Sequence, residues 1–319
     1  MIDALASTPP RLDARKFRDP LTTATGETRA RVALKSLDTL WFNTGTLCNL
    51  TCQNCYIESS PRNDRLAYLS AAEVATYLDE IAALGLPARL IGFTGGEPFM
   101  NRDLPAMLED TLRRGLDAIV LTNAMAPMRH HRPALLALRE RHGARLTLRV
   151  SLDHYGAAVH ELERGRRSWG PTLAGLKWLA EHGFAINVAS RYLSGESEAA
   201  IRDGFRRLFA RHAIPLDADD PVALMIFPEM DATVDVPEIT TACWGILGKS
   251  PDSVMCASSR MVVKRKGAAA PTVVACTLLP YDALWDLGPS LGDAMGEVPL
   301  NHPHCAKFCV LGGAACSRD

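Results

Sequence analysis

Short apolar runs alternate with amphipathic stretches over residues 38–235 of this 319-residue chain. Runs of this length with many branched side chains are typical of strands buried on both faces of a sheet. Strands separated by helical stretches predict βαβ units and a parallel α/β sheet, with enough units for an open or full barrel. The predicted strands are DTLWFNTG at 38–45, ARLIGFTGG at 88–96, LDAIVLTNA at 116–124, ARLTLRVSLD at 144–153, FAINVASRYL at 184–193 and VALMIFPEM at 222–230.

The helical stretches carry start and stop signals of their own. Ser70 with Glu73 forms a capping-box pattern, and Gly85 follows the last apolar position of that stretch. Three later stretches, at 101–115, 133–143 and 168–183, also end in glycine. These signals support the helix predictions between the strands.

The two ends of the chain differ from this middle part. Residues 1–37 are polar and weakly periodic, which predicts an extended arm, whereas 38–235 forms the predicted barrel. From Cys256 to Cys276, two β-rich runs flank a turn containing Gly and Pro, which predicts a hairpin with a cysteine at each end. Residues 236–319 are therefore expected to form a small cysteine-rich domain.

Composition narrows the classes of function. The net charge is −1, with no basic cluster, so we expect neither a nucleic-acid nor a membrane partner. No apolar run is long enough to span a bilayer and no secretory signal begins the sequence, so we expect a cytoplasmic protein. In that reducing compartment nine cysteines favour metal binding or catalysis over disulfides.

Three of these cysteines lie in CNLTCQNCY at 48–56, with CxxxCxxC spacing. A structural zinc site needs four ligands, and no fourth Cys or His follows in this loop. Three buried cysteines without a ligand role are an alternative that this polar loop disfavours. Three thiolates on a [4Fe-4S] cluster leave one iron without a protein ligand, and that iron can bind a substrate or cofactor.

At these residues the sequence resembles the radical SAM superfamily, whose signature is CxxxCxxC followed by an aromatic residue after the first strand of a partial (β/α)6 TIM-like barrel. The resemblance implies that Cys48, Cys52 and Cys55 hold a [4Fe-4S] cluster and that S-adenosylmethionine chelates the open iron. It also implies that Tyr56 lies near the adenine.

Further motifs at the predicted strand ends resemble those of the superfamily. In FTGGEP, Gly95 and Gly96 would let the backbone approach the ligand, and Glu97 would accept a hydrogen bond from the methionyl ammonium. An ordinary glycine turn is the alternative interpretation.

Three later strand ends complete the implied cofactor pocket. Thr122 and Asn123 in LTNA approach the cofactor, and Ser151 with Asp153 in VSLD would hydrogen-bond the ribose, although both motifs also suit simple helix N-caps. The text SLDHYGAAVHELERG resembles the peptide-maturase branch of the superfamily. Arg191 is a candidate partner for the methionyl carboxylate, and a solvated arginine at a strand end is the alternative.

The cysteines near the C-terminus resemble the twitch and SPASM extensions, which hold auxiliary [4Fe-4S] clusters. The chain departs from a full SPASM domain because it has fewer cysteines and carries CxxxCx6C in place of CxxCx5C. One fully ligated cluster is therefore expected, and a second, incompletely ligated cluster is an alternative. Zinc is the alternative metal for four thiolates. The candidate ligands are Cys256, Cys276 and two of Cys305, Cys309 and Cys316.

Three other residues carry groups capable of chemistry. Cys243 stands apart in TTACWGILG, and resemblance to radical epimerases implies a hydrogen-atom donor, whereas burial as a small apolar side chain is the favoured alternative. His302 and His304, next to Cys305, could serve as metal ligands, but two histidines beside a proline are more often surface polar residues.

The resemblance implies an oxidoreductase or maturase that reductively cleaves S-adenosylmethionine to a 5′-deoxyadenosyl radical, with flavodoxin or ferredoxin as electron donor. The HELERG text and the hairpin favour a peptide substrate, but the arm is too short to fold as a peptide-recognition module. A small metabolite, such as a sugar, nucleotide or amino acid derivative, is the alternative substrate. A non-catalytic metal-binding or electron-transfer protein is a third possibility, which the GGE, SLD and Arg191 matches disfavour.

Overall fold

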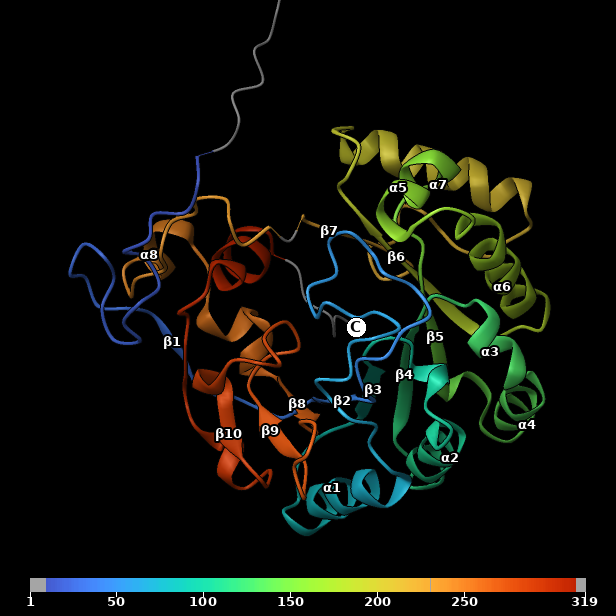
Figure 1. Ribbon diagram of the computed structural model, residues 1–319, viewed down its shortest axis with the longest axis horizontal. Helices are drawn as coiled ribbons and strands as arrows, with labels where there is room; N and C mark the ends of the chain where they lie inside the picture. The colour runs from blue at the N-terminus through green and yellow to red at the C-terminus, as the bar shows by residue number, and fades with distance from the viewer. Residues whose placement is uncertain (1–9, 230, 314–319) are drawn as a thin grey trace, which may run out of the picture.

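Six parallel strands form the centre of the molecule, as predicted from the apolar runs (Figure 1). The computed structural model describes residues 10–229 and 231–313, so Cys316 lies outside the described residues. Neighbours in the sequence are neighbours in the sheet, in the order β2, β3, β4, β5, β6, β7. These strands are β2 (Thr39–Asn43), β3 (Leu90–Thr94), β4 (Asp117–Thr122), β5 (Leu146–Ser151), β6 (Ala185–Arg191) and β7 (Leu224–Phe227).

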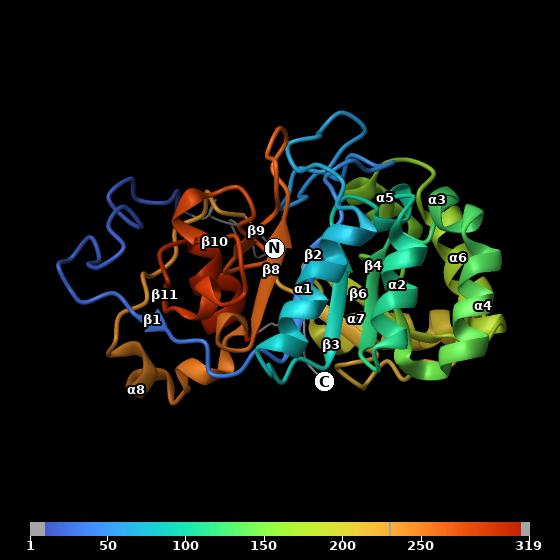
Figure 2. The same cartoon turned by 90° about the horizontal axis from the view of Figure 1, so that it is seen from below.

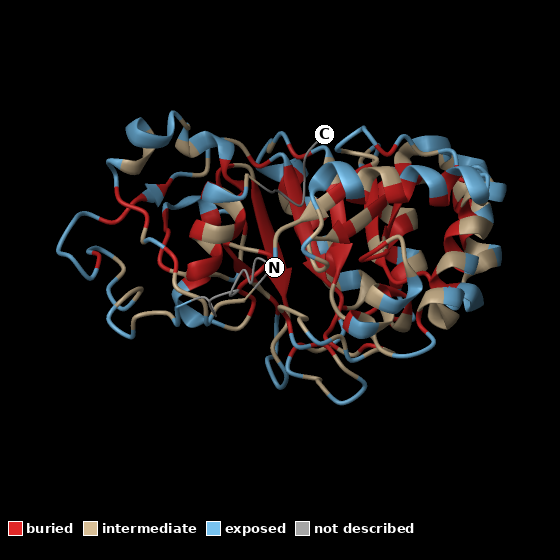
Figure 3. Cartoon of the chain, turned by 90° about the horizontal axis from the view of Figure 1, so that it is seen from above, coloured by how far each residue is buried: buried red, intermediate tan, exposed pale blue. Residues whose placement is uncertain are grey.

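Helices cover the outer face of these strands and turn their polar sides to solvent (Figure 3). The predicted capping box is present, because the Ser70 hydroxyl accepts from the Glu73 N–H and the Glu73 carboxylate accepts from the Ser70 N–H. The helices are α1 (Ala71–Ala83), α2 (Leu104–Arg113), α3 (Ala126–His130), α4 (Arg132–His142), α5 (Ala157–Arg164), α6 (Trp169–Glu181), α7 (Glu198–Arg211) and α8 (Cys243–Leu247). Short 3₁₀ segments lie at Pro98–Met100, Gly143–Arg145, Pro251–Ser253, Met255–Ala257, Ala283–Trp285 and Asp293–Met295.

The predicted hairpin is present and continues the barrel sheet. Strand β8 (Ser259–Val263) pairs in parallel with β2, and β9 (Thr272–Val274) and β10 (Asp286–Gly288) follow antiparallel beyond it. A π-helix, Cys305–Leu311, packs behind the hairpin. One nine-stranded sheet therefore runs from the barrel into the cysteine-rich segment (Figure 2).

The arm runs along the C-terminal segment instead of the barrel helices (Figure 2). Its short strand β1 (Arg31–Val32) pairs antiparallel with β11 (Val298–Pro299). The buried Arg29 guanidinium donates to Glu238 at 2.5 Å, and this carboxylate is also buried. The described part of the arm is thus an integral part of the cysteine-rich half.

The largest apolar core lies between the parallel strands and their helices. Phe42 and Phe93, on adjacent strands, stack with ring centroids 5.8 Å apart. A second core joins Trp41 of β2 to the hairpin and to Trp285. Among the described residues, no helix has the length and apolar character needed to cross a membrane.

Gly175 sets how closely α6 approaches the end of β4, and substituting it tests the packing. A Cβ at this position would lie 2.0 Å from the Ala124 carbonyl oxygen, which is backbone and has little room to move. We expect Gly175→Ala to lower the free energy of unfolding by about 1–3 kcal/mol, because the overpacked helix must shift. Denaturant unfolding measures the change.

Gly245 in the exposed helix α8 provides the matched control, because a Cβ added there would meet open space, with no packed neighbour within 4 Å. Gly245→Ala is expected to be neutral or to stabilise by up to about 1 kcal/mol through helix propensity. Equal effects of the two substitutions would contradict the packing described for α6.

Candidate functional site

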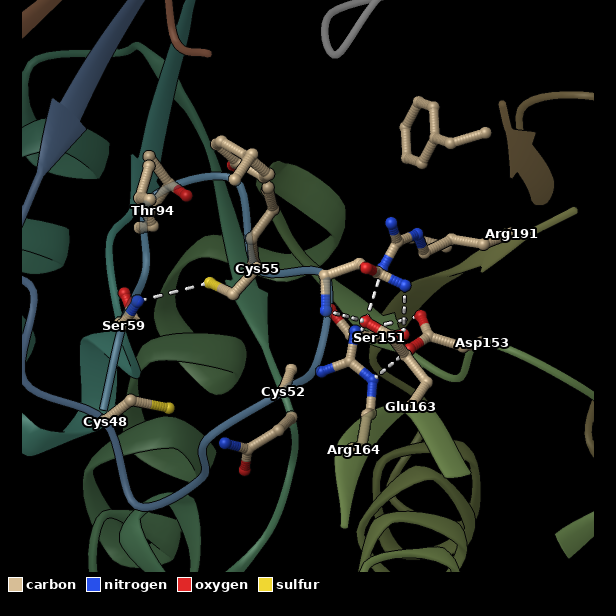
Figure 4. A pocket seen from close by; sticks show the side chains of 18 of the residues that line it. Cys48, Cys52, Cys55, Ser59, Thr94, Ser151, Asp153, Glu163, Arg164 and Arg191 are labelled. Carbon is tan, nitrogen blue, oxygen red and sulfur yellow. Dashed lines mark hydrogen bonds and ion pairs between the residues drawn. The ribbon is translucent and has the colours of Figure 1, made fainter. Parts of the chain in front are cut away.

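A cavity opens at the carboxyl ends of the parallel strands, where the loop carrying the first three cysteines covers the sheet (Figure 4). It encloses about 1100 Å³, counting its open mouth. Such a position is the usual place for chemistry in parallel barrels. Most of the candidate residues of this half line it together: Cys48, Cys52, Cys55, Tyr56, Gly95, Gly96, Thr122, Asn123, Ser151, Asp153 and Arg191.

The two glycines after β3 let the backbone touch the cysteine loop. The φ angle of Gly95 is +137°, and a Cβ on Gly96 would lie 2.2 Å from the Leu47 carbonyl oxygen. The Gly96 N–H donates to the Gly45 carbonyl at 2.8 Å. These glycines therefore join β3 to the cysteine loop as well as lining the cavity.

Glu97 lies behind the cavity wall, with an exposed fraction of 1%. Its carboxylate accepts from the Thr122 hydroxyl at 2.7 Å and from the Asn123 N–H at 2.8 Å, so it joins the ends of β3 and β4. Burial raises the pKa of Glu97 to about 7, against the lowering effect of these donors. The structure thus gives Glu97 internal partners, and the ammonium contact remains a prediction.

The front thiols sit in an environment that favours their neutral form unless a cation binds. Burial raises the pKa of Cys48 to about 12 and that of Cys52 to about 11. Backbone N–H groups nevertheless point at two sulfurs, since Leu50 donates to Cys48 Sγ at 3.4 Å and Ser59 donates to Cys55 Sγ at 3.3 Å. These donors suit sulfurs that carry negative charge.

Glu163 and Arg164 line the front cavity but were not among the predicted site residues. Both belong to the sequence HELERG at 160–165. Arg164, at the end of α5, pairs with Asp153 at 2.7 Å. Glu163 pairs with Arg191 at 2.6 Å and accepts from both the backbone N–H and the side-chain amide of Asn54 at 3.0 Å. Glu163 therefore fixes the loop between Cys52 and Cys55.

Arg191 has one nitrogen engaged and one available. Its Nη1 donates to Glu163, whereas its Nη2 is buried and has no hydrogen-bond partner among the residues that the structure describes. Since Arg191 lines the cavity, this second nitrogen is suited to a carboxylate there. The alternative of a solvated arginine is wrong, because its side chain is only 12% exposed.

Four cysteines of the C-terminal segment line a second cavity, which encloses about 390 Å³ when its open mouth is counted: Cys256, Cys276, Cys305 and Cys309. Burial raises the pKa of Cys256 to about 11 and also raises that of Cys305 well above its usual range. In the described ranges, no three Cys, His, Asp or Glu side chains converge closely enough to hold one metal ion, so the thiols surround the space without meeting at a point.

Arg260 places a buried positive charge beside this second cavity. Its guanidinium, 1% exposed as a residue, donates to the carbonyls of Cys256, Ser259, Ala294 and Gly296. Within 10–229 and 231–313 it forms no ion pair with a carboxylate, and burial lowers its pKa to about 10. A cation without a counter-charge favours an anionic group in the adjacent space, such as a thiolate-bound cluster.

The two histidines are not surface residues, contrary to the sequence-based expectation. His304 is 7% exposed and lines the second cavity, and His302 packs edge-on against Trp285 with centroids 5.9 Å apart. Burial lowers the pKa of each to about 4.

Cys243 lies at the start of α8, which Figure 1 labels, and it lines neither cavity. Its sulfur accepts from the Thr240 N–H at 3.4 Å, and its side chain packs partly buried beside an apolar cluster that includes Ile239 and Leu300. This is the environment of the small apolar side chain that the sequence favoured.

The two cavities adjoin each other through residues of the C-terminal segment. Leu278 lines both cavities, and Phe308, between Cys305 and Cys309, lines the front one. Tyr281 donates its hydroxyl to the Ile57 carbonyl at 2.7 Å and thereby holds the front cysteine loop.

Comparison with known proteins identifies the family to which this chain belongs. The sequence profile of the Radical SAM superfamily matches residues 42–207, which span the cysteine loop and the strands through β6. The chain belongs to the radical SAM superfamily. Members of this superfamily bind a [4Fe-4S] cluster and S-adenosylmethionine, and the three thiols and the available Arg191 nitrogen of the front cavity fit these groups.

Curated relatives of this radical SAM protein differ in their substrates. The antilisterial bacteriocin subtilosin biosynthesis protein AlbA of Bacillus subtilis is 31% identical over 143 residues, which are 44% of this chain and 30% of AlbA. The GTP 3′,8-cyclase of Rhodococcus opacus is 34% identical over 185 residues, 54% of this chain and 50% of the cyclase. The matched segments thus span half or less of these relatives.

Solved structures share the fold at low identity. Streptococcus suis SuiB bound to S-adenosylmethionine gives a TM-score of 0.58 at 12% identity, over 80% of this chain and 63% of SuiB. The protein anSMEcpe with bound AdoMet gives 0.57 at 14% identity, over 80% of this chain and 79% of anSMEcpe. Both comparisons extend past the barrel into the C-terminal segment of this chain.

The raised pKa of Glu97 predicts a pH dependence of stability. The pKa of this carboxyl is about 7 in the folded state and 4.5 ordinarily. Between these two pH values only the folded state keeps the proton, so the free energy of unfolding falls as pH rises through this window. As pH rises through this window, the free energy of unfolding of the wild type should fall by about 3 kcal/mol relative to that of Glu97→Gln. Denaturant unfolding of both proteins over this pH range measures the change. The same dependence of the free energy of unfolding on pH in wild type and Glu97→Gln would contradict the raised pKa of Glu97.

The contacts of Glu163 predict that it stabilises the cysteine loop. Glu163→Ala leaves Arg191 without its ion-pair partner and Asn54 without its acceptor, so the free energy of unfolding should fall by about 3 kcal/mol and iron binding should decrease. Glu161→Ala is the control on the same helix, because among the described residues this carboxylate accepts only from the Trp169 N–H at 3.3 Å. Equal stability and iron content in the two variants would refute the role of Glu163.

Proposed function

We propose that this radical SAM enzyme abstracts a hydrogen atom from a peptide substrate and modifies that peptide. The observation that carries the proposal is the contact between the two thiol-lined cavities, which share Leu278. A substrate in the front cavity would then lie beside a second metal group. The relatives AlbA, by its name a bacteriocin biosynthesis protein, and SuiB, solved with a precursor peptide, support a peptide over a small metabolite.

In this proposal Cys48, Cys52 and Cys55 hold the front cluster. Arg191, kept in place by Glu163, binds the methionyl carboxylate, whereas Tyr56 contacts the adenine and Ser151 the ribose. When bound and reduced, the cluster and S-adenosylmethionine supply a 5′-deoxyadenosyl radical. Asp153 is held by Arg164, so its carboxylate keeps one orientation toward the cavity while the cysteine loop limits access of water.

The rear thiols are proposed to hold one auxiliary [4Fe-4S] cluster through Cys256, Cys276, Cys305 and Cys309. The charge of Arg260 and the burial of the site support an anionic cluster, and zinc is the alternative occupant. Residues 38–235 then act as the barrel domain and 236–319 as the auxiliary-cluster domain, with an arm at 1–37. We further propose flavodoxin or ferredoxin as electron donor, and cytoplasmic localisation.

A small metabolite remains the second candidate substrate because one relative is a GTP 3′,8-cyclase. The two candidates differ in the source of the hydrogen atom that reaches 5′-deoxyadenosine. The source organism, grown in D2O, provides deuterated extract that can be separated into a peptide fraction and a small-metabolite fraction. Mass spectrometry of the nucleoside then identifies the fraction that donates deuterium to the reconstituted, reduced protein.

We expect deuterium in 5′-deoxyadenosine with the peptide fraction, and no nucleoside from the Cys48/Cys52/Cys55→Ala variant. Cys243→Ala is the thiol control and should still form labelled nucleoside, because Cys243 lines neither cavity. Label from the small-metabolite fraction alone would overturn the peptide proposal in favour of the metabolite. Failure of the reduced wild type to form nucleoside would refute the radical chemistry.

A further inference from the structure

His304 is a buried polar side chain that faces the rear thiols without a partner for one ring nitrogen. It is 7% exposed and lines the same cavity as Cys256, Cys276, Cys305 and Cys309. Its Nδ1 is buried and has no hydrogen-bond partner among the residues described. Leaving such a buried group unsatisfied is costly, so the site is better explained if the cavity contents provide the partner.

The surroundings hold the His304 ring in this position. The His304 backbone N–H donates to His302 Nδ1 at 3.1 Å, and the two rings pack with centroids 4.6 Å apart. His302 in turn packs against Trp285 and is not among the residues that line the rear cavity. The His304 ring, which lines the rear cavity, is therefore supported by the His302 ring, which does not line it.

The chemistry of the cavity identifies the kind of partner. Thiolates and bridging sulfides of an iron-sulfur cluster accept hydrogen bonds, and such bonds raise the reduction potential because they stabilise the more negative, reduced state. Arg260 acts in the same direction by charge, but its described hydrogen bonds all go to carbonyls and none to sulfur. Among the described residues that line the rear cavity, His304 has a buried ring nitrogen without a hydrogen-bond partner.

We propose that His304 is a positioning and tuning residue of the rear site, which donates a hydrogen bond from Nδ1 to a sulfur of the auxiliary cluster and raises its reduction potential. This inference rests on the proposed auxiliary cluster. It assigns His304 no role as an iron ligand, since four thiols already line the cavity.

The test isolates the rear cluster in the Cys48/Cys52/Cys55→Ala background, reconstituted without oxygen. His304→Leu removes the donor, whereas His304→Asn has nearly the same shape as leucine and returns an N–H near the position of Nδ1. Iron content and an EPR-monitored redox titration are measured for all three proteins. A second readout is the hyperfine coupling of ¹⁵N-labelled histidine to the reduced cluster.

We expect about four irons in each protein. His304→Leu should make reduction about tenfold less favourable, which corresponds to about 59 mV for one electron, and His304→Asn should restore most of this difference. The weak histidine nitrogen coupling should be lost in His304→Leu. If leucine prevents folding, His304→Phe replaces it as the apolar variant.

Other outcomes separate the two proposals. Equal potentials for the apolar and asparagine variants would overturn the hydrogen bond while leaving the cluster in place. Loss of iron in both His304 variants would also overturn it, because His304 would then be needed to hold the metal. If the background protein itself binds zinc or no iron, the auxiliary cluster fails, and the tuning role fails with it.

Discussion

The parallel pairing of β8 with β2 is the constraint on which the arrangement of both thiol sites depends. It sets Thr39 opposite Ser259 and so fixes the register of the hairpin against the barrel. At the tip of the hairpin, the Ala67 N–H donates to the Lys264 carbonyl at 2.7 Å, next to the cysteine loop. At its base, Cys256 and Cys276 come together at the second cavity. A shift of this register would displace both sites at once.

The buried arginines of the two cavities differ in the partners of their guanidinium groups. In the front cavity two lining arginines have a carboxylate partner, since Arg164 pairs with Asp153 and Arg191 with Glu163. At the rear, Arg260 has carbonyl acceptors and no carboxylate among the described residues. Because an unbalanced buried charge is costly, these two ion pairs stabilise the front wall, whereas the rear wall gains from an anionic group.

Two buried carboxylates give the front cavity its rigidity. Glu97 joins the ends of β3 and β4, and Glu163 joins α5 and β6 to the loop between Cys52 and Cys55. Each accepts hydrogen bonds from backbone N–H groups that would otherwise be buried without partners. The proposed hydrogen-atom abstraction would need its reacting groups held in one geometry, and these contacts hold the cavity wall that would surround them.

Local features of the chain were enough to predict the strands, the capped helices, the hairpin and the three front cysteines. Apolar periodicity, capping residues and close ligand spacing all act within a few residues, so they can be read along the sequence. The inward turn of His304, the junction at Leu278 and the attachment of Glu163 to Asn54 could not be predicted in this way. Glu163 and Asn54 are 109 positions apart, and what brings them together is the folding of the strands and α5 around one sheet edge. Contacts of this kind depend on sheet register and helix packing, which no local pattern encodes.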